Sequence, residues 1–221
     1  NGLDWNPATG ELWSTVVERD LLGPDLVPDY LTNVPIGAQY GWPWYYWKSN
    51  LDPRVNEPMP LYLNEYIRKP EYAMGAHATA LGMRFVPAGS RLGPQFVSGA
   101  VVARHGSWNR NPLSGYDVVF IRFDANGNPQ GMPVPLLTGF IKDNDHVRGR
   151  PTWVAFERTG GLLVSDDTAG IVWRVISPGA PPSPGVKPVE VGHLPKLNSI
   201  NGANEAEFRR KFEEMMQRGQ K

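Results

Sequence analysis

One pattern in this chain recurs at a long, fixed distance and limits the folds that the chain can adopt. Residues 3–16 (LDWNPATGELWSTV) read as a strand, a tight turn and a second strand, and residues 154–165 (VAFERTGGLLVS) repeat that pattern. Leu3 corresponds to Val154, 151 positions later, and the glycine of each turn occupies the same place. Repeats of roughly 40–50 residues that each form a small antiparallel sheet are typical of β-propellers, so this distance accommodates about three blades.

Further strand patterns indicate an all-β chain. A looser third copy of the repeat runs through residues 80–85 and continues at 99–102, after a longer turn that contains Gly and Pro. Residues 117–123 (DVVFIRF) alternate before a turn at 124–127, and residues 171–175 (IVWRV) form another short apolar run. Alternating or β-branched runs bounded by Gly, Asn and Asp predict strands joined by tight turns.

These patterns divide the chain into three parts. Residues 1–177 are predicted to form a partial β-propeller of about three to four blades. Residues 178–203 are rich in Pro and Gly and read as a linker or a strap over the surface. Residues 204–219 read as a helix, with Asn204 as its N-cap and an apolar stripe that packs on its own domain or docks on a partner. So few blades do not readily close a ring, and we expect the others upstream of Asn1 or in another chain.

Composition excludes several classes of function. The chain carries 22 Lys and Arg against 22 Asp and Glu, which gives no sign of a nucleic-acid or anionic-membrane surface. It has no cysteine, so disulfides, thiolate metal sites and a cysteine nucleophile are excluded. No apolar run approaches the roughly 20 residues that span a bilayer. There is also no HExxH, GxSxG, P-loop or dinucleotide motif.

Two arginines separated by one glycine form the clearest candidate binding site. Arg148 and Arg150 precede the apolar run at 153–156. Side chains at positions i and i+2 of an extended segment point to the same side, so both guanidinium groups can face one ligand. Guanidinium groups are suited to carboxylates and phosphates. The pair therefore indicates a compact polyanion, although two solvated loop arginines would give the same pattern.

Other candidates lie near predicted strand ends. The loop 18–25 (ERDLLGPD) follows the first hairpin, and its carboxylates and free Gly-Pro carbonyls suit a hard cation such as Ca²⁺. His77 precedes one predicted strand, and His105 and Ser107 follow another. Acidic Gly-Pro loops and structural histidines are also common, so the residue types alone leave both interpretations open.

Taken together and in order, these stretches resemble the C-terminal half of the soluble quinoprotein sugar dehydrogenases, the glucose/sorbosone dehydrogenase family, and most closely its L-sorbosone dehydrogenase branch. The matching stretches are GLDWNPATGELW (2–13), ERDLLGPD (18–25), YGWP (40–43), GAH (75–77), HGSWNR (105–110) and RGRP (148–151). The resemblance implies that the chain forms the C-terminal blades of a six-bladed β-propeller that binds pyrroloquinoline quinone (PQQ) and Ca²⁺. It also implies oxidation of an aldose or a sugar aldehyde by hydride transfer to PQQ, with Ca²⁺ as a Lewis acid.

The resemblance assigns roles to individual residues. Gly23 and Pro24 match the Gly-Pro pair whose backbone carbonyls hold Ca²⁺, and Arg148 and Arg150 match the arginines on the PQQ carboxylates. His77, His105 and Ser107 match more loosely with other cofactor contacts, and the family's cofactor-binding Lys has no clear counterpart. No catalytic residue is expected in this segment, because the family's His base lies in the N-terminal half.

The resemblance also implies partners and a location. We expect a sugar or aldehyde substrate, an electron acceptor such as a cytochrome or a quinone, and the N-terminal half of the propeller in the same or another chain. A periplasmic or secreted protein is expected. Two other readings stay open at this point: a non-catalytic propeller that serves as a binding or assembly module, and a Ca²⁺-dependent propeller lactonase or hydrolase.

Overall fold

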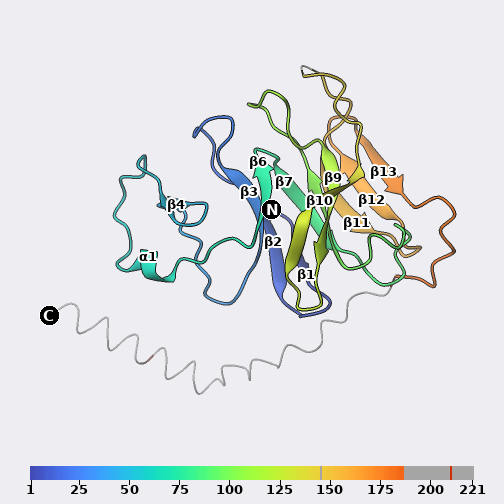
Figure 1. Ribbon diagram of the computed structural model, residues 1–221, viewed down its shortest axis with the longest axis horizontal. Coiled ribbons are helices and arrows are strands. Elements are labelled where there is room, and N and C mark those ends of the chain that lie inside the picture. The colour runs from blue at the N-terminus through green and yellow to red at the C-terminus, as the bar shows by residue number, and fades with distance from the viewer. Residues whose placement is uncertain (145, 187–209, 211–221) are drawn as a thin grey trace. The chain divides into compact units, whose positions relative to one another are not determined.

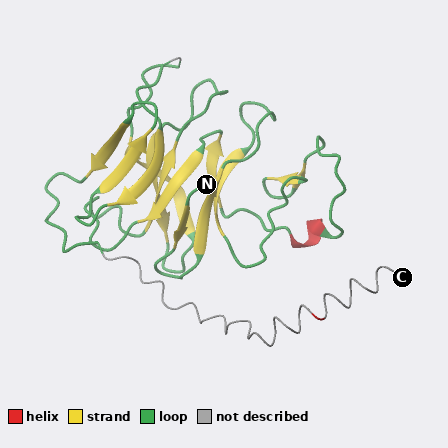
Figure 2. Ribbon diagram, turned by 180° about the vertical axis from the view of Figure 1, so that it is seen from behind, coloured by secondary structure: helices red, strands yellow, loops and turns green. Residues whose placement is uncertain are grey.

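The computed structural model describes residues 1–144, 146–186 and 210. Within residues 1–186 almost all regular structure is antiparallel strand, with one short helix, α1 (Leu63–Tyr66) (Figure 2). The predicted strap at 178–203 is described only as far as residue 186. The predicted helix at 204–219 lies outside the described residues, apart from Arg210.

Three sheets account for most of the strands (Figure 1). The first has the order β1-β2-β3-β6, the second β10-β9-β8-β7 and the third β11-β12-β13. The first sheet comprises β1 (Leu3–Trp5), β2 (Leu12–Val16), β3 (Pro28–Asn33) and β6 (Tyr72–Ala76). The second comprises β7 (Ala80–Phe85), β8 (Gly99–Arg104), β9 (Asp117–Phe123) and β10 (Pro129–Leu137). The third comprises β11 (Pro151–Phe156), β12 (Leu162–Asp166) and β13 (Ile171–Val175), and a small ribbon pairs β4 (Tyr45–Tyr46) with β5 (Asn50–Leu51).

The predicted repeats are hairpins at equivalent places in the three sheets. The first copy forms β1 and β2, the second forms β11 and β12, and the looser third copy forms β7 and β8. The predicted strands 117–123 and 171–175 coincide with β9 and β13. The sequence therefore predicted these hairpins and their order, whereas β3, β6 and β10 were not predicted.

The second sheet lies between the other two, and its inner strands β8 and β9 are buried on both faces. Successive residues of a strand point to opposite sides, so Ala100 and Val102 face the first sheet while Val101 and Ala103 face the third. One core cluster contains Trp13, Leu31, Met74, Met83, Val119, Ile121 and Phe123, and the other contains Val86, Leu92, Val118, Phe120, Val154, Leu162 and Val164. Continuous apolar runs in β8 and β9 are the expected sequence of strands covered on both sides.

Glycine allows the sheets to approach closely where their first strands meet. A Cβ on Gly82 of β7 would lie 2.6 Å from the Trp153 Cα of β11, and one on Gly2 would lie 2.4 Å from the Leu81 carbonyl oxygen. Both contacts are with backbone, which cannot move aside as a flexible side chain can. These two positions therefore require glycine for packing.

A long insertion between β3 and β6 is held to the loop 17–27 by buried charges. The Asp52 carboxylate is fully buried and pairs with Arg19 and with Arg54, whose Nη2 is 2.8 Å away. Arg54 Nη1 also donates to the carbonyls of Asp20 (3.0 Å) and Leu21 (3.2 Å). One buried carboxylate thus fixes the loop that carries the candidate metal ligands.

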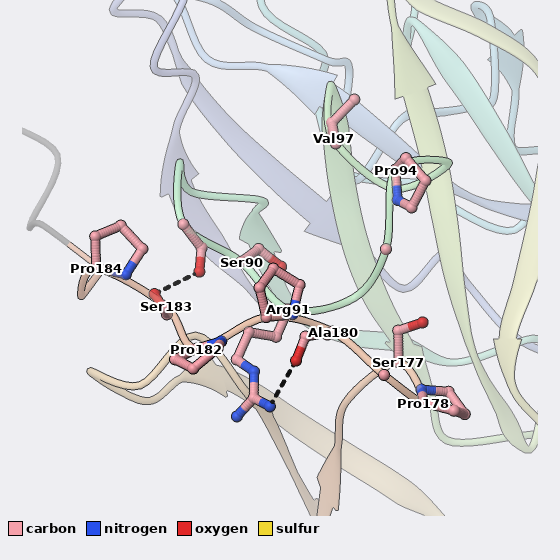
Figure 3. A pocket seen from close by; sticks show the side chains of 14 residues that line it. Ser90, Arg91, Pro94, Val97, Ser177, Pro178, Ala180, Pro182, Ser183 and Pro184 are labelled. Atoms are coloured by element: carbon pink, nitrogen blue, oxygen red, sulfur yellow. Dashed lines mark hydrogen bonds between the residues drawn. The ribbon is translucent and has the colours of Figure 1, made fainter.

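At the end of the second and third sheets opposite the loop 17–27, the first part of the predicted strap lines an open pocket of about 430 Å³ (Figure 3). Ser183 Oγ donates to the Gly89 carbonyl (2.7 Å), and Arg91 Nη2 donates to the Ala180 carbonyl (3.1 Å). The lining is mostly Gly, Pro, Ser and Ala, with no carboxylate or imidazole. None of the helices in the described part is long and apolar enough to cross a membrane.

Truncation of Phe120 tests the packing between the second and third sheets. Phe120 is 1% exposed in the core, whereas Met132 on β10 of the same sheet is 83% exposed. We expect Phe120→Ala to lower the free energy of unfolding by about 3–5 kcal/mol, because it removes transfer free energy and leaves a cavity. Met132→Ala should change it by less than about 0.5 kcal/mol. Chemical denaturation of the intact protein measures both, and equal effects would contradict the assigned core.

Candidate functional site

Antiparallel pairing brings the candidate residues to one end of the three sheets. The connections β2–β3, β6–β7, β8–β9, β10–β11 and β12–β13 all leave from that end, which is uppermost in Figure 1. These connections carry every residue that the sequence assigned to the site. Residues as far apart as 23 and 150 are therefore neighbours in one loop cluster.

His77 binds the candidate metal loop. Its Nε2 lies 2.9 Å from the Gly23 carbonyl oxygen, and its Nδ1 lies 3.3 Å from Asp20 Oδ1. The imidazole is buried, and because a carbonyl can only accept, Nε2 is the donor in the first contact. His77 thus positions the loop through one of the two carbonyls assigned to Ca²⁺. The Pro24 carbonyl has no hydrogen bond with the described residues.

Asp29 is a second anchor of the same loop, and the sequence analysis did not identify it. Its carboxylate accepts from the backbone N–H groups of Glu18 (3.0 Å) and Ala80 (3.1 Å), which joins the loop 17–27 to the start of β7. Burial raises the pKa of Asp29 to about 6, against the opposing effect of these hydrogen bonds. The available signal was an acidic residue within the segment PDYLTN, which forms β3.

The β8–β9 connection (residues 105–116), here called the histidine loop, forms one hydrogen-bonded unit with Arg150. His105 N–H donates to the Thr79 carbonyl (2.9 Å), and Arg150 donates from Nε to the His105 carbonyl (3.1 Å) and from Nη2 to the Gly106 carbonyl (2.9 Å). The guanidinium carbon of Arg150 lies 5.4 Å from the centroid of the Tyr116 ring. Arg150 is therefore held by neutral carbonyls and an aromatic face.

Arg148 and Ser107 differ in what surrounds them. Arg148 is exposed, and its side chain has no hydrogen bond or ion pair with the described residues. Ser107 is fully buried, and its Oγ accepts from Ser114 N–H (3.0 Å), so it supports the β8–β9 loop. Direct contact of Ser107 with a cofactor stays a prediction. Gly23 and His77 are in direct contact, as are His105 and Arg150, whereas Pro24, Arg148 and Ser107 contact no other predicted site residue through their side chains.

A metal would depend on backbone oxygens in this chain. No three or more His, Asp or Glu side chains of the described part lie together in a way that could hold a metal ion. Ca²⁺ takes six to eight oxygen ligands, which include backbone carbonyls. The Gly23 and Pro24 residues are exposed, and a carbonyl oxygen that accepts one hydrogen bond, as that of Gly23 does from His77, keeps a second lone pair, so these two carbonyls fit part of a calcium site and the remaining ligands would have to come from elsewhere.

Comparisons with known proteins give a family and a fold. A family model described as TrAA12-like matches residues 62–178, about half of the chain. An uncharacterized protein of Borreliella burgdorferi is 25% identical over 175 residues, which cover 79% of this chain and 45% of that protein.

Solved structures of three enzymes share the fold. The calcium structure of Trichoderma reesei Carbohydrate-Active Enzymes Family AA12 has a TM-score of 0.59 at 21% identity and covers 77% of this chain and 50% of its own. The holo PQQ domain of a Coprinopsis cinerea pyranose dehydrogenase has a TM-score of 0.56 at 23% identity (80% and 53% covered). A glucose dehydrogenase has a TM-score of 0.52 at 16% identity (80% and 44% covered). The chain thus spans about half the length of these relatives, and the predicted propeller fold class is confirmed.

The raised pKa of Asp29 predicts a pH dependence of stability. Its folded pKa of about 6 exceeds the ordinary value of 3.8, so the folded state binds the proton more tightly. Relative to Asp29→Asn, the wild-type protein should therefore lose stability as pH rises from about 4 to about 6, by roughly 3 kcal/mol in total. Denaturation of both intact proteins across this range measures the difference.

Asp124 provides a control of opposite sign. The backbone N–H of Asn128 lowers its pKa, so relative to Asp124→Asn the wild-type protein should gain stability as pH rises from acid. A pH-independent difference for Asp29→Asn would show that its carboxyl does not carry the assigned shift.

Proposed function

This chain belongs to the TrAA12-like family, and we propose that it forms the C-terminal part of a PQQ- and Ca²⁺-dependent oxidoreductase that oxidises an aldose or a sugar aldehyde such as sorbosone. The observation that carries the proposal is the state of two arginines. Arg148 has no partner and Arg150 has only neutral partners among the described residues, although carboxylates lie nearby.

Neighbouring arginines at the same end of the sheets show the contrast. Arg104 is paired with Asp117 at 2.6 Å, and Arg110 is paired with Asp25 at 3.1 Å. Asp167 directs its carboxylate to His105 at 2.9 Å; this hydrogen bond is the main cause that lowers the pKa of Asp167, and the nearby charge of Arg150 adds to it. Two arginines separated by one residue, with no carboxylate partner among the described residues, fit an anionic ligand, and the three carboxylates of PQQ match that requirement.

Each residue of the site then has a defined task. Arg148 and Arg150 would bind cofactor carboxylates, and the carbonyls of Gly23 and Pro24 would contribute to calcium binding while His77 and Asp29 fix their loop. When bound, PQQ supplies the acceptor for two electrons from the sugar, and Ca²⁺ supplies Lewis acidity. His105 and Ser107 would hold the β8–β9 loop in the conformation that binds Arg150.

The three histidines in the part of the chain that the structure describes all have hydrogen-bond partners, and none is assigned as a general base. His77 is bonded to Gly23 and Asp20, His105 to Asp167, and His146 to Asp143 at 2.8 Å. From the family resemblance, which places the His base in the N-terminal half, we propose that the base which removes the sugar hydroxyl proton comes from the part of the propeller that this chain does not contain, in the same or another chain. A cytochrome or quinone as electron acceptor and a periplasmic or secreted location belong to the same proposal.

Reconstitution of the complete protein tests this function. The protein would be incubated with PQQ, Ca²⁺ and an artificial electron acceptor, and acceptor reduction would be followed with glucose, other aldoses and sorbosone. We expect sugar-dependent reduction that requires PQQ. PQQ binding without turnover of any sugar would favour the binding-module alternative, and hydrolysis of a sugar lactone without PQQ would favour the lactonase alternative.

Removal of either arginine should weaken cofactor binding. Hydrogen bonds to charged groups contribute about 1.5–3 kcal/mol, so Arg148→Ala and Arg150→Ala should each raise the PQQ dissociation constant about tenfold or more. Arg122→Ala is the matched control, because Arg122 is exposed on β9 away from this loop cluster. Absorbance titration of the intact proteins with PQQ gives the constants, and equal affinities for all four proteins would refute the assignment.

Removal of calcium tests the Gly23 and Pro24 carbonyls. A ligand that binds only the folded state stabilises it by RT ln(1 + [L]/Kd), or about 2.7 kcal/mol at a hundredfold excess over Kd. We expect Ca²⁺ to raise the Tm of the complete, chelator-treated protein, while Mg²⁺ at the same concentration has less effect because it prefers a rigid octahedral shell. No shift with Ca²⁺ at millimolar concentration would argue against the site.

A further inference from the structure

The turn between β12 and β13 contains two adjacent aspartates that the function above does not use. Asp166 is the last residue of β12 and is 3% exposed, whereas Asp167 is exposed. Both lie at the end of the sheets that carries the candidate site. A buried carboxylate is costly unless hydrogen bonds replace its water, so the partners of Asp166 indicate its task.

Asp166 bonds to the backbone of the arginine loop. Its Oδ1 accepts from Arg150 N–H (2.9 Å) and from Ala169 N–H (2.9 Å), and its Oδ2 accepts from Trp173 Nε1–H (3.1 Å). Burial alone would raise the pKa of Asp166, but the N–H groups of Ala169 and Arg150 outweigh it, and the pKa is lowered. The group is therefore a carboxylate at neutral pH, with its hydrogen bonds directed to neutral donors.

The residue between the two arginines packs directly on this carboxylate. A Cβ on Gly149 would lie 1.9 Å from Asp166 Oδ2 and 2.9 Å from Phe140 Cδ1. Arg148 N–H donates to the Phe140 carbonyl (2.6 Å), and the Phe140 ring meets Trp173 edge-on at 5.8 Å between centroids. The Arg148–Arg150 segment is thus held between Phe140 and Asp166, and its middle residue has no room for a side chain.

The second aspartate of the turn reaches the other loop of the site. Both carboxylate oxygens of Asp167 lie close to His105 Nε2, at 2.9 and 3.0 Å. The His105 carbonyl in turn accepts from Arg150 Nε. One turn therefore contacts the arginine loop through Asp166 and the histidine loop through Asp167.

We propose that Asp166 is a positioning residue for the cofactor: it fixes the backbone of Arg150 and leaves the guanidinium groups of Arg148 and Arg150 free for the carboxylates of PQQ. This inference rests on the proposed function. A carboxylate paired with the guanidinium itself would cancel the charge that the ligand needs. Because Asp166 is saturated by backbone and indole N–H groups, it orders the loop without that cancellation.

Asp166→Asn in the complete protein tests the inference through binding rather than activity. The amide retains one acceptor oxygen and places an N–H₂ group among three donors, so the loop should lose order. We expect the dissociation constant for PQQ to rise about tenfold. The trimethyl ester of PQQ, which lacks the carboxylates, should bind the wild-type and variant proteins with equal, weaker affinity.

Asp124→Asn is the matched control, because Asp124 also accepts two backbone N–H groups at 2.9 Å in a turn, but at the other end of the sheets. It should leave PQQ affinity unchanged. Gly149→Ala disturbs the contact between residue 149 and the Asp166 carboxylate by adding a Cβ at residue 149. This variant replaces Asp166→Asn as the test if Asp166→Asn does not fold. Its loss of PQQ affinity should match that of Asp166→Asn, and the double variant should show no further loss.

Three outcomes separate the alternatives. Wild-type affinity for PQQ in Asp166→Asn and Gly149→Ala would overturn the positioning role while leaving the proposed function intact. An equal fractional loss of affinity for PQQ and its ester would mean that Asp166 supports only the fold, which also overturns it. Absence of PQQ binding by the wild-type protein would contradict the proposed function and this inference with it.

Discussion

The burial of strands β8 and β9 of the second sheet on both faces is the constraint on which the rest of the structure depends. These strands supply side chains to two separate cores, and each core seals one neighbouring sheet against the second sheet. A fixed register in all three sheets follows, because a slip by one residue would exchange the two faces. Fixed register at one end of the sheets is what allows loops from five different connections to meet with defined geometry.

The candidate site carries positive charge that no carboxylate of the described residues neutralises. Among the arginines at this end, Arg104 and Arg110 have carboxylate partners, whereas Arg148 and Arg150 have none within the described residues. Two buried aspartates of the same region, Asp29 and Asp166, bond to backbone N–H groups instead of guanidinium groups, whereas buried Asp52 pairs with Arg19 and Arg54. Negative charge therefore orders the loops, and positive charge remains available to a ligand.

Much of the fold was predictable from the sequence because its signals are local and periodic. The β9 and β13 boundaries follow from runs of apolar residues, and the repeat at a distance of 151 residues identified equivalent hairpins. The site was predictable only in part. Residue types and the family resemblance led to Gly23, His77, His105 and Arg150, which the fold brings into one cluster.

Asp29 and Asp166 were not predicted, because their importance comes from long-range partners. Asp29 bonds to a residue 51 positions away and Asp166 to one 16 positions away, and no periodicity encodes such contacts. The bond between His77 and the Gly23 carbonyl, 54 positions apart, was missed for the same reason. Local sequence patterns predict strands. The conformations of the loops in this protein depend instead on long-range hydrogen bonds to residues of neighbouring sheets and loops.

The contact between Gly149 and Asp166 has a consequence for how distant relatives can be recognised. The two positions share a volume that holds one carboxylate and no Cβ, so we expect them to vary together during evolution. Sequences that keep an aspartate at the end of this strand should keep glycine between the arginines. Those that replace the aspartate with a smaller residue gain room for a side chain there. Covariation of this pair would identify homologues by the shape of the arginine loop, even where the overall identity is too low to align them.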